Sequence, residues 1–238
     1  MPKRKLPRPD VEQILQDKDW LPIWKSVPSR HRLLDLRLAF TTAEHGRSIG
    51  TLFELTKGWQ PMLLIVETTN LAKFGGTYSY SAFVRMLLLS LNERRYSSSC
   101  PLSVYQRGLA KDRNRFGGSG ETFLFDFTTD GAYRVYPWVG AHPANGSPAH
   151  ESNGDPPHGS NASMREKWIK DMASFFVVAD HHGIGVGGGG SGFGLWVNGD
   201  LTVAHSHECA TFANRPLGGP GTYGNNLDVA LLEVWVFT

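Results

Sequence analysis

Two short segments carry side chains whose types and spacing could support catalysis. Glu121 follows a flexible turn at residues 118–120 and opens a phenylalanine-rich stretch, a setting that suits a general acid or base. Ser206 and His207 could supply a nucleophile and its base if the fold placed them beside Glu121. The structural alternative is that Glu121 accepts backbone or hydroxyl hydrogen bonds and joins two loops. Since no Gly-x-Ser-x-Gly nucleophile elbow frames these residues, spacing leaves both roles open.

A third candidate is a metal site. His205, His207 and Cys209 alternate, so on a strand their side chains would lie on one face. Imidazole and thiolate groups are good zinc ligands, but the sequence shows no fourth ligand. A polar strand end with a semi-buried cysteine is therefore the favoured interpretation, and we expect no metal.

Residues 185–190 fit the glycine spacing of dinucleotide-binding loops. That chemistry needs a helix next, so that backbone N–H groups face a pyrophosphate, whereas residues 193–197 have the pattern of a strand. No Lys-Ser or Lys-Thr pair follows either, as a P-loop would require. We interpret these glycines as positions of positive φ or close strand approach, and expect no cofactor.

The elements that must position these residues are mostly strands. Apolar runs and alternation predict nine of them, and the last is unusually apolar and expected to be central. Many short strands, few helices and no β-α-β alternation predict an α+β, mainly β fold: two antiparallel sheets packed as a β-sandwich with flanking short helices. The predicted strands cover residues 33–40, 62–68, 73–79, 121–128, 132–138, 174–179, 193–197, 201–204 and 227–237.

Two helices are predicted. A short amphipathic helix runs from residue 10 to about 20, after which Pro22 and Pro28 break the chain. A second helix is capped by Ser48 and ended by Gly58. We therefore divide the chain into a basic tail with its short helix, residues 1–32, and a domain at 33–238 with insertions at about 84–114 and 140–166.

Composition narrows the class of protein. The 238 residues are 40% hydrophobic and 19% charged, which excludes a wholly disordered chain and a coiled coil. Two cysteines, Cys100 and Cys209, are too few for a disulfide framework. No apolar stretch follows the basic residues at 3–5, so no signal peptide is expected and a cytoplasmic location is the default.

Positive charge gathers in two places. Residues 1–8 carry four basic and no acidic residues, and residues 85–115 carry seven basic against two acidic ones. Such clusters could contact anionic lipid, nucleic acid or an acidic protein face, or could simply keep these segments soluble. No RNA-binding motif or recognition helix accompanies them, so we expect no specific nucleic acid. Contact of the basic insertion 85–115 with an anionic membrane stays a hypothesis.

Several segments, taken in order, form a recognisable set. They are FTTAEHGRSI at 40–49, TLF at 51–53, LLIVE at 63–67, FGGTYS at 74–79, GSGETFLF at 118–125, VYPW at 135–138, GGGGSGFGLW at 187–196, GDL at 199–201, SHECATFANRPL at 206–217 and LEVW at 232–235. From about residue 33 onward the chain resembles the TLDc domain, the module of oxidation-resistance proteins. Positions of this motif set with an expected structural role are Gly118, Gly120, Gly188, Gly189, Gly190, Asp200, Phe212, Asn214 and Trp235.

The resemblance implies a β-sandwich flanked by helices and a role in protection against oxidative stress. Several members of the family bind the V1 sector of the vacuolar proton-pumping ATPase and alter its assembly, and no enzymatic activity is firmly established for it. Glu121, Ser206 and His207 match positions discussed as active-site-like, so they are carried over as candidates. Ala213 and Arg215 depart from the family pattern, which puts a shared partner surface around them in question.

From the resemblance we expect a non-enzymatic interaction module that binds V1 subunits and protects against oxidative stress. One alternative is a hydrolase or redox enzyme that uses Glu121 with Ser206 and His207, or the Cys209 thiol. Another is the TLDc module of a Rab GTPase-activating protein of membrane trafficking, although residues 193–196 look more like the oxidation-resistance type. The expected location is cytoplasmic or peripheral to endolysosomal membranes, with mitochondrial or nuclear pools left open.

Overall fold

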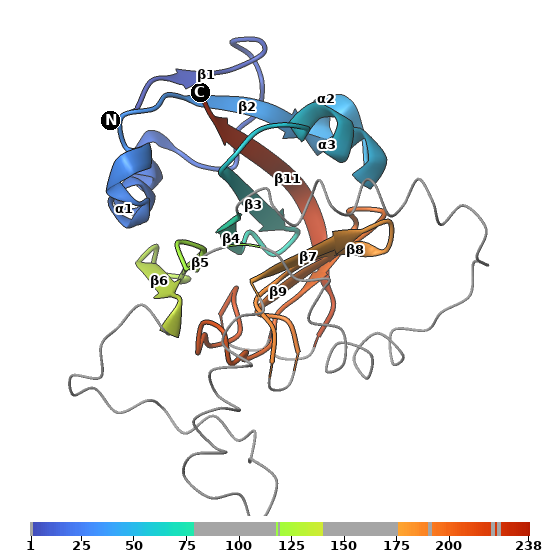
Figure 1. The fold of residues 1–238 in the computed structure, drawn as a ribbon. Coiled ribbons are helices and arrows are strands. Elements are labelled where there is room, and N and C mark those ends of the chain that lie inside the picture. The colour runs from blue at the N-terminus through green and yellow to red at the C-terminus, as the bar shows by residue number, and fades with distance from the viewer. Residues whose placement is uncertain are drawn as a thin grey trace, which may run out of the picture.

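The computed structural model describes residues 2–78, 118, 120–139, 176–189, 192–219, 222 and 225–238. One long strand, β11 (Leu227–Phe237), lies at the centre of this part of the fold (Figure 1). It pairs antiparallel with β3 (Met62–Thr68) on one side and β2 (Leu36–Thr41) on the other. Its first two residues pair instead with β10 (Val203–His205), so β11 belongs to both layers. The prediction of a central strand at 227–237 is confirmed.

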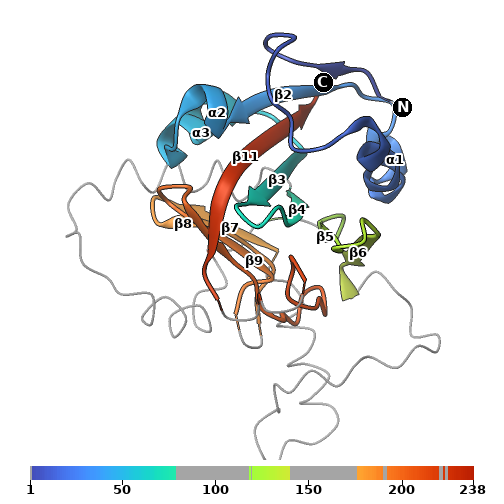
Figure 2. The same cartoon turned by 180° about the vertical axis from the view of Figure 1, so that it is seen from behind.

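Two antiparallel layers extend from this strand. The first layer runs from β3 through β4 (Lys73–Tyr78) and β5 (Phe123–Phe127) to β6 (Tyr133–Pro137). The second runs from β10 through β9 (Leu195–Asn198) and β8 (Gly183–Val186) to β7 (Val177–Asp180), and it lies across the N-terminal end of β11 (Figures 1 and 2). Their inner faces share one buried core that includes Leu64, Val66, Phe74, Leu124, Ile184, Val186, Leu195 and Val197. The predicted β-sandwich of α+β, mainly β class is confirmed.

The N-terminal segment, residues 4–31, covers the outer face of the first layer. It comprises β1 (Arg4–Lys5), which pairs parallel with β2, helix α1 (Asp17–Ser26) and the 3₁₀ helix η1 (Ser29–His31). Trp20 of α1 packs edge-on against Trp235 of β11, with ring centroids 4.9 Å apart. The β1–β2 pair is the parallel exception in an otherwise antiparallel arrangement of described strands.

Helix α1 corrects the predicted N-terminal helix. The predicted helix spans residues 10–20, whereas α1 begins at Asp17 and contains Pro22. The start fits the local sequence, because Gln16 N–H donates to Asp19 Oδ2 at 3.0 Å and fastens the first turn. Proline inside a helix removes a backbone hydrogen bond, so it normally ends the helix. Here the burial of Trp20, Ile23 and Trp24 against the sheet offsets that loss.

Two short helices, α2 (Thr42–His45) and α3 (Ile49–Thr56), follow β2. As predicted, Ser48 caps α3: its Oγ accepts from Thr51 N at 3.3 Å. Helix α3 ends at Thr56, two residues before Gly58, whose φ of 85° takes the chain out of the helix. Helix α2 was not predicted, because a single turn leaves no periodicity to detect.

Arg47, between α2 and α3, fastens these helices to the sandwich. Its guanidinium donates to the carbonyl of Leu201 at 2.7 Å, in the turn between β9 and β10. It also donates to Val229 O and Ala230 O, both at 2.9 Å, where the pairing of β11 with β3 shifts register. The side chain therefore supplies hydrogen bonds to carbonyls at an irregular point of the central strand.

Strand β8 was missed by sequence analysis because it alternates glycine with an apolar residue. A Cβ atom on Gly183 would lie 2.6 Å from the Trp196 ring, and one on Gly185 would lie 2.4 Å from the Phe193 ring. Large side chains of the neighbouring strand β9 and of the residues just before it thus occupy the space that these glycines leave. None of the described helices is long and apolar enough to cross a membrane. Cys100, Gly190, the basic stretch 85–115 and the insertions at 84–114 and 140–166 lie outside the described residues.

Candidate functional site

Glu121 lies in the turn before β5 and meets the N-terminal segment. Its carboxylate forms an ion pair with Arg30 and lies 3.8 Å from His31 Nε2. Arg30 Nε donates to the same imidazole nitrogen at 2.9 Å. Burial and the Arg30 guanidinium lower the pKa of His31, while Glu121 acts in the opposite direction. Sequence analysis missed Arg30 and His31, because nothing in their spacing relates them to residue 121.

A cavity of about 190 Å³ lies beside this cluster. Glu121, His31, Tyr78 and Phe237 form part of its wall. Thr122 also lines the cavity, and its buried hydroxyl has no hydrogen-bond partner among the described residues. The cavity can hold about six water molecules at their liquid volume. A carboxylate and an imidazole at such a cavity could exchange protons with a small ligand, but Arg30 already engages the carboxylate.

Two glycines shape the turn that carries Glu121. Gly118 has a φ of 125°, and a Cβ atom there would lie 2.6 Å from Phe176 Cβ. A Cβ atom on Gly120 would lie 2.4 Å from Trp138 Cε3. The turn is therefore pressed against aromatic side chains from two other segments, and bulkier residues at either position would displace it.

Ser206 lies in a different environment, between the layers. Its buried hydroxyl donates to Gly194 O and accepts from Leu217 N at 2.9 Å. Glu121 instead faces the N-terminal segment, which covers the outer face of the first layer. The described contacts therefore do not join Glu121 and Ser206 into one site, and Ser206 links the strand that begins at 195 to the loop at 214–218.

His205, His207 and Cys209 do not share a strand face, because β10 ends at His205. The two imidazole rings lie 5.4 Å apart in a T-shaped arrangement. Burial lowers the pKa of His205 to about 4 and also lowers the pKa of His207. Cys209 is buried, its Sγ donates to Asn214 Oδ1 at 3.0 Å, and burial raises its pKa to about 12. Over the described ranges, no three His, Cys, Asp or Glu side chains are arranged to hold a metal ion.

Backbone groups of the glycine-rich stretch form hydrogen bonds with the loop after β10. Thr211 Oγ1 accepts from Gly188 N at 3.2 Å and donates to Gly188 O at 3.0 Å, and Ala210 N donates to Gly189 O at 3.1 Å. Gly187 has a φ of 74°, and a Cβ atom there would lie 2.7 Å from Cys209 Sγ. The predicted close approach and positive φ are confirmed, and the next element is strand β9, not a helix.

The remaining motif residues have structural partners or lie at turns. Asn214, buried, donates to His207 O at 2.9 Å and to Arg215 O at 3.0 Å, and Phe212 is buried in the inner core. Trp235 is fully buried, and its Nε1 donates to Glu233. Asp200 lies exposed in the turn between β9 and β10.

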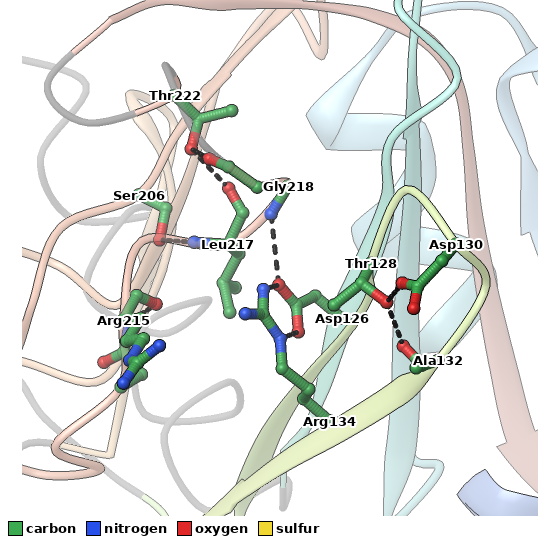
Figure 3. Close-up of polar contacts among 12 residues, drawn as sticks. Asp126, Thr128, Asp130, Ala132, Arg134, Ser206, Arg215, Leu217, Gly218 and Thr222 are labelled. Atoms are coloured by element: carbon green, nitrogen blue, oxygen red, sulfur yellow. Dashed lines mark hydrogen bonds and ion pairs between the residues drawn. The ribbon is translucent and has the colours of Figure 1, made fainter.

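Sequence analysis missed a buried ion pair that holds the loop at 213–219 to the first layer (Figure 3). Asp126 of β5 is fully buried and receives both Nε, at 2.9 Å, and a terminal nitrogen of Arg134 from β6. Its second oxygen also accepts from Gly218 N at 3.3 Å. The signal in the sequence was an aspartate at an inward position of an apolar strand, a residue type that is rarely buried without a partner.

These bonds give the loop at 213–219 a fixed shape. Arg215, at its exposed tip, projects beside the network (Figure 3). Ala213 adopts a φ of 45°, in the left-handed region that asparagine and glycine enter at lower cost than alanine. The two residues that depart from the family pattern thus lie exposed on an ordered loop, and loops of this kind commonly carry functional residues.

Comparison with known proteins places these residues in a family. The family model of the TLDc domain matches residues 9–84 and 162–238, more than half of the chain. Oxidation resistance protein 1 of Xenopus laevis is 27% identical over 229 residues, which cover 96% of this chain and 19% of the relative. GTPase-activating protein skywalker of Drosophila melanogaster is 27% identical over 218 residues, covering 90% of this chain and 28% of the relative.

Nuclear receptor coactivator 7 of Mus musculus is 26% identical over 214 residues, which cover 90% of this chain and 16% of the relative. The chain therefore spans less than a third of the length of these three relatives. The matched regions include β2, β3, β4 and every strand from β7 to β11. This chain belongs to the TLDc domain family.

Proposed function

We propose that this chain is a TLDc interaction module that protects against oxidative stress without catalysing a reaction. Its family membership and its similarity to oxidation resistance protein 1 support the protective role. The observation that carries the non-enzymatic part is that the candidate reactive groups already have structural partners. Ser206 bonds two backbone groups, Cys209 is a buried thiol with a raised pKa, and Glu121 is paired with Arg30.

The partner that we propose is the V1 sector of the vacuolar proton-pumping ATPase, which the family resemblance implies. We place the contact on the loop at 213–219, because Ala213 and Arg215 are exposed there and Asp126 and Ser206 hold the loop in place. Since these two exposed residues depart from the family pattern, the contact would differ in detail from that of other members. A loop ordered before binding loses little conformational entropy when a partner docks. Anionic membrane contact through residues 85–115 is a separate proposal with a distinct signature, since charge-driven binding weakens steeply with salt.

The test is capture of purified V1 by the immobilised full chain at low and physiological salt. We expect retention at both salt concentrations and a loss of at least tenfold in affinity for Arg215→Glu, whose exposed site permits folding. Lys57→Glu is the matched control, because it makes the same charge change at a residue exposed beside α3. If the folded chain captures no V1, the proposal that V1 is the partner is refuted. If both variants capture V1 equally well, the proposal that the loop at 213–219 makes the contact is refuted.

The protective role has its own test, because it can hold when the partner is wrong. Expression of the chain in peroxide-sensitive cells should restore survival, and Glu121→Gln should restore it equally well. The Arg30 side chain of this ion pair is 64% exposed and that of Glu121 is 36% exposed, so loss of the pair should change the free energy of unfolding by less than about 1 kcal/mol. Loss of protection by Glu121→Gln at unchanged melting temperature would favour the enzymatic alternative.

The second candidate is the TLDc module of a GTPase-activating protein of membrane trafficking. The observation in its favour is that skywalker matches this chain at the same identity as oxidation resistance protein 1. This candidate predicts that the chain corrects a trafficking defect in cells that lack such a protein and leaves peroxide survival unchanged. Rescue of peroxide survival alone would exclude it.

A further inference from the structure

One buried peptide group fastens the N-terminal segment to the first layer. The N–H of Ile14 donates to Glu233 Oε1 at 2.8 Å, and the carbonyl of Ile14 accepts from Lys73 Nζ at 2.6 Å. Glu233 is a fully buried residue of β11, and Lys73 opens β4. The other oxygen of Glu233 accepts from Trp235 Nε1 at 2.8 Å. A carboxyl group at the centre of the sheet thus holds a segment more than 200 residues away in sequence.

The surroundings of Glu233 are apolar. Trp20, Ile23 and other side chains of the N-terminal segment form a second core with Trp235 and the outer face of the first layer. The charged groups that act on Glu233 are Glu67 of β3 and Lys73, which lie 3.5 Å from each other. Burial raises the pKa of Glu233 to about 7, with Glu67 acting in the same direction and Lys73, Trp235 and Ile14 against it.

We propose that residues 11–27 form a strap that closes over the outer face of the first layer with uptake of a proton at Glu233. Closure covers this carboxyl group with Ile14 and Trp20, and opening returns it to water. The strap precedes β2 in the chain, so it can lift while the pairing of β2 with β11 stays intact. Trp20 Nε1 is buried without a hydrogen-bond partner among the described residues, and Pro22 removes one backbone hydrogen bond from α1. Opening lets water bond these polar groups, which offsets part of the packing free energy that opening loses.

The sign of the pH dependence follows from the two states. In the closed strap the pKa of Glu233 is about 7, and in water it is near its ordinary 4.5. Between these values the closed state binds more protons, so acid favours closure and rising pH favours opening. The equilibrium constant for opening should increase about 70-fold between pH 5 and pH 8, and it should level off above pH 7.

Hydrogen exchange of the full chain, followed by mass spectrometry and corrected for intrinsic exchange rates, tests the proposal. Protection of peptides within residues 11–27 should fall by about 70-fold from pH 5 to pH 8. At pH 8 these peptides should be at least about tenfold less protected than peptides from β11, because the strap opens without unfolding the sheet. A pH-independent strap, or equal protection of strap and β11 at pH 8, would overturn the proposal.

Two variants separate the titration from the packing. Glu233→Gln imitates the neutral acid, so strap protection should no longer change between pH 5 and pH 8. Lys73→Met removes the donor to Ile14 O but leaves the carboxyl group, so protection should fall at both pH values while the pH dependence remains. A pH dependence that survives in Glu233→Gln would assign the effect to another group and refute the role of Glu233. If Glu233→Gln does not fold, Glu67→Gln replaces it: loss of this neighbouring charge should lower the pKa of Glu233 and move the pH dependence of strap protection to lower pH, and an unmoved profile would refute the role of Glu233.

Discussion

Replacing Ser206 with alanine tests whether this hydroxyl supports the fold or takes part in a reaction. In the structure it donates to Gly194 O and accepts from Leu217 N, and all three groups are buried. Alanine fills nearly the same space, so the substitution removes two hydrogen bonds without a large change in packing. The Leu217 N–H loses this acceptor and the Gly194 carbonyl loses this donor.

The magnitude follows from these two groups. Each buried polar group without a partner costs about 1–3 kcal/mol, so we expect the free energy of unfolding to fall by about 2–6 kcal/mol. For a chain of this size 1 kcal/mol shifts Tm by about 2–4 °C, which gives a decrease of about 4–24 °C. Ser48→Ala is a matched control, because this exposed cap accepts a single hydrogen bond at 3.3 Å and should cost about 0.5–1 kcal/mol.

The assay is thermal and urea unfolding of the two variants beside the wild type, together with peroxide survival of cells that express each. If Ser206 is structural, protection falls only in proportion to the folded fraction. A Ser206→Ala variant that melts with the wild type and yet fails to protect would show that the hydroxyl reacts, and it would refute the non-enzymatic interpretation.

Three further outcomes are expected. Arg47→Met should lower the free energy of unfolding by about 1.5–3 kcal/mol in urea, because three backbone carbonyls lose a charged donor; an unchanged midpoint would show that water replaces it. Ala213→Gly should raise stability by about 0.5–1 kcal/mol by relieving a φ of 45°, and a lower Tm would contradict that account. In a Cys100→Ser background, Cys209 should resist iodoacetamide at pH 8 until guanidinium unfolds the chain, since its pKa is about 12; rapid labelling of folded protein would contradict the burial.

Sequence patterns predicted the strands whose residue types do not depend on the side chains of neighbouring strands. β3 and β11 are continuous apolar runs, and each appears within a residue of its predicted bounds. β8 was missed because its glycines are required by Trp196 of β9 and by Phe193 just before it, which is information that lies outside the strand itself. The helix α1 was misplaced because burial of its aromatic residues outweighs the local effect of Pro22.

The arrangement of the candidate site could not be predicted from the sequence, for a different reason. The residue types at Glu121, Ser206 and His207 indicated possible chemistry, but which layer each faces depends on how the chain crosses between the sheets. Adjacent strands β5 and β6 set the register that brings Asp126 to Arg134, and the sequence gives no distance across that hairpin. The partners Arg30 and His31 come from the far end of the chain, where no local pattern relates them to Glu121.

The position of β11 in the chain has a consequence for how the molecule is made. β11 follows every other described strand, yet β2, β3 and β10 all pair with it. During synthesis these three strands keep unpaired edges until β11 has been made, and exposed edges of this kind promote aggregation. The hydrogen bond from Ile14 to Glu233 closes a loop of more than 200 residues, a long-range contact of the kind that slows folding. The described sheet of this TLDc chain can therefore complete its strand pairing only after β11 is available.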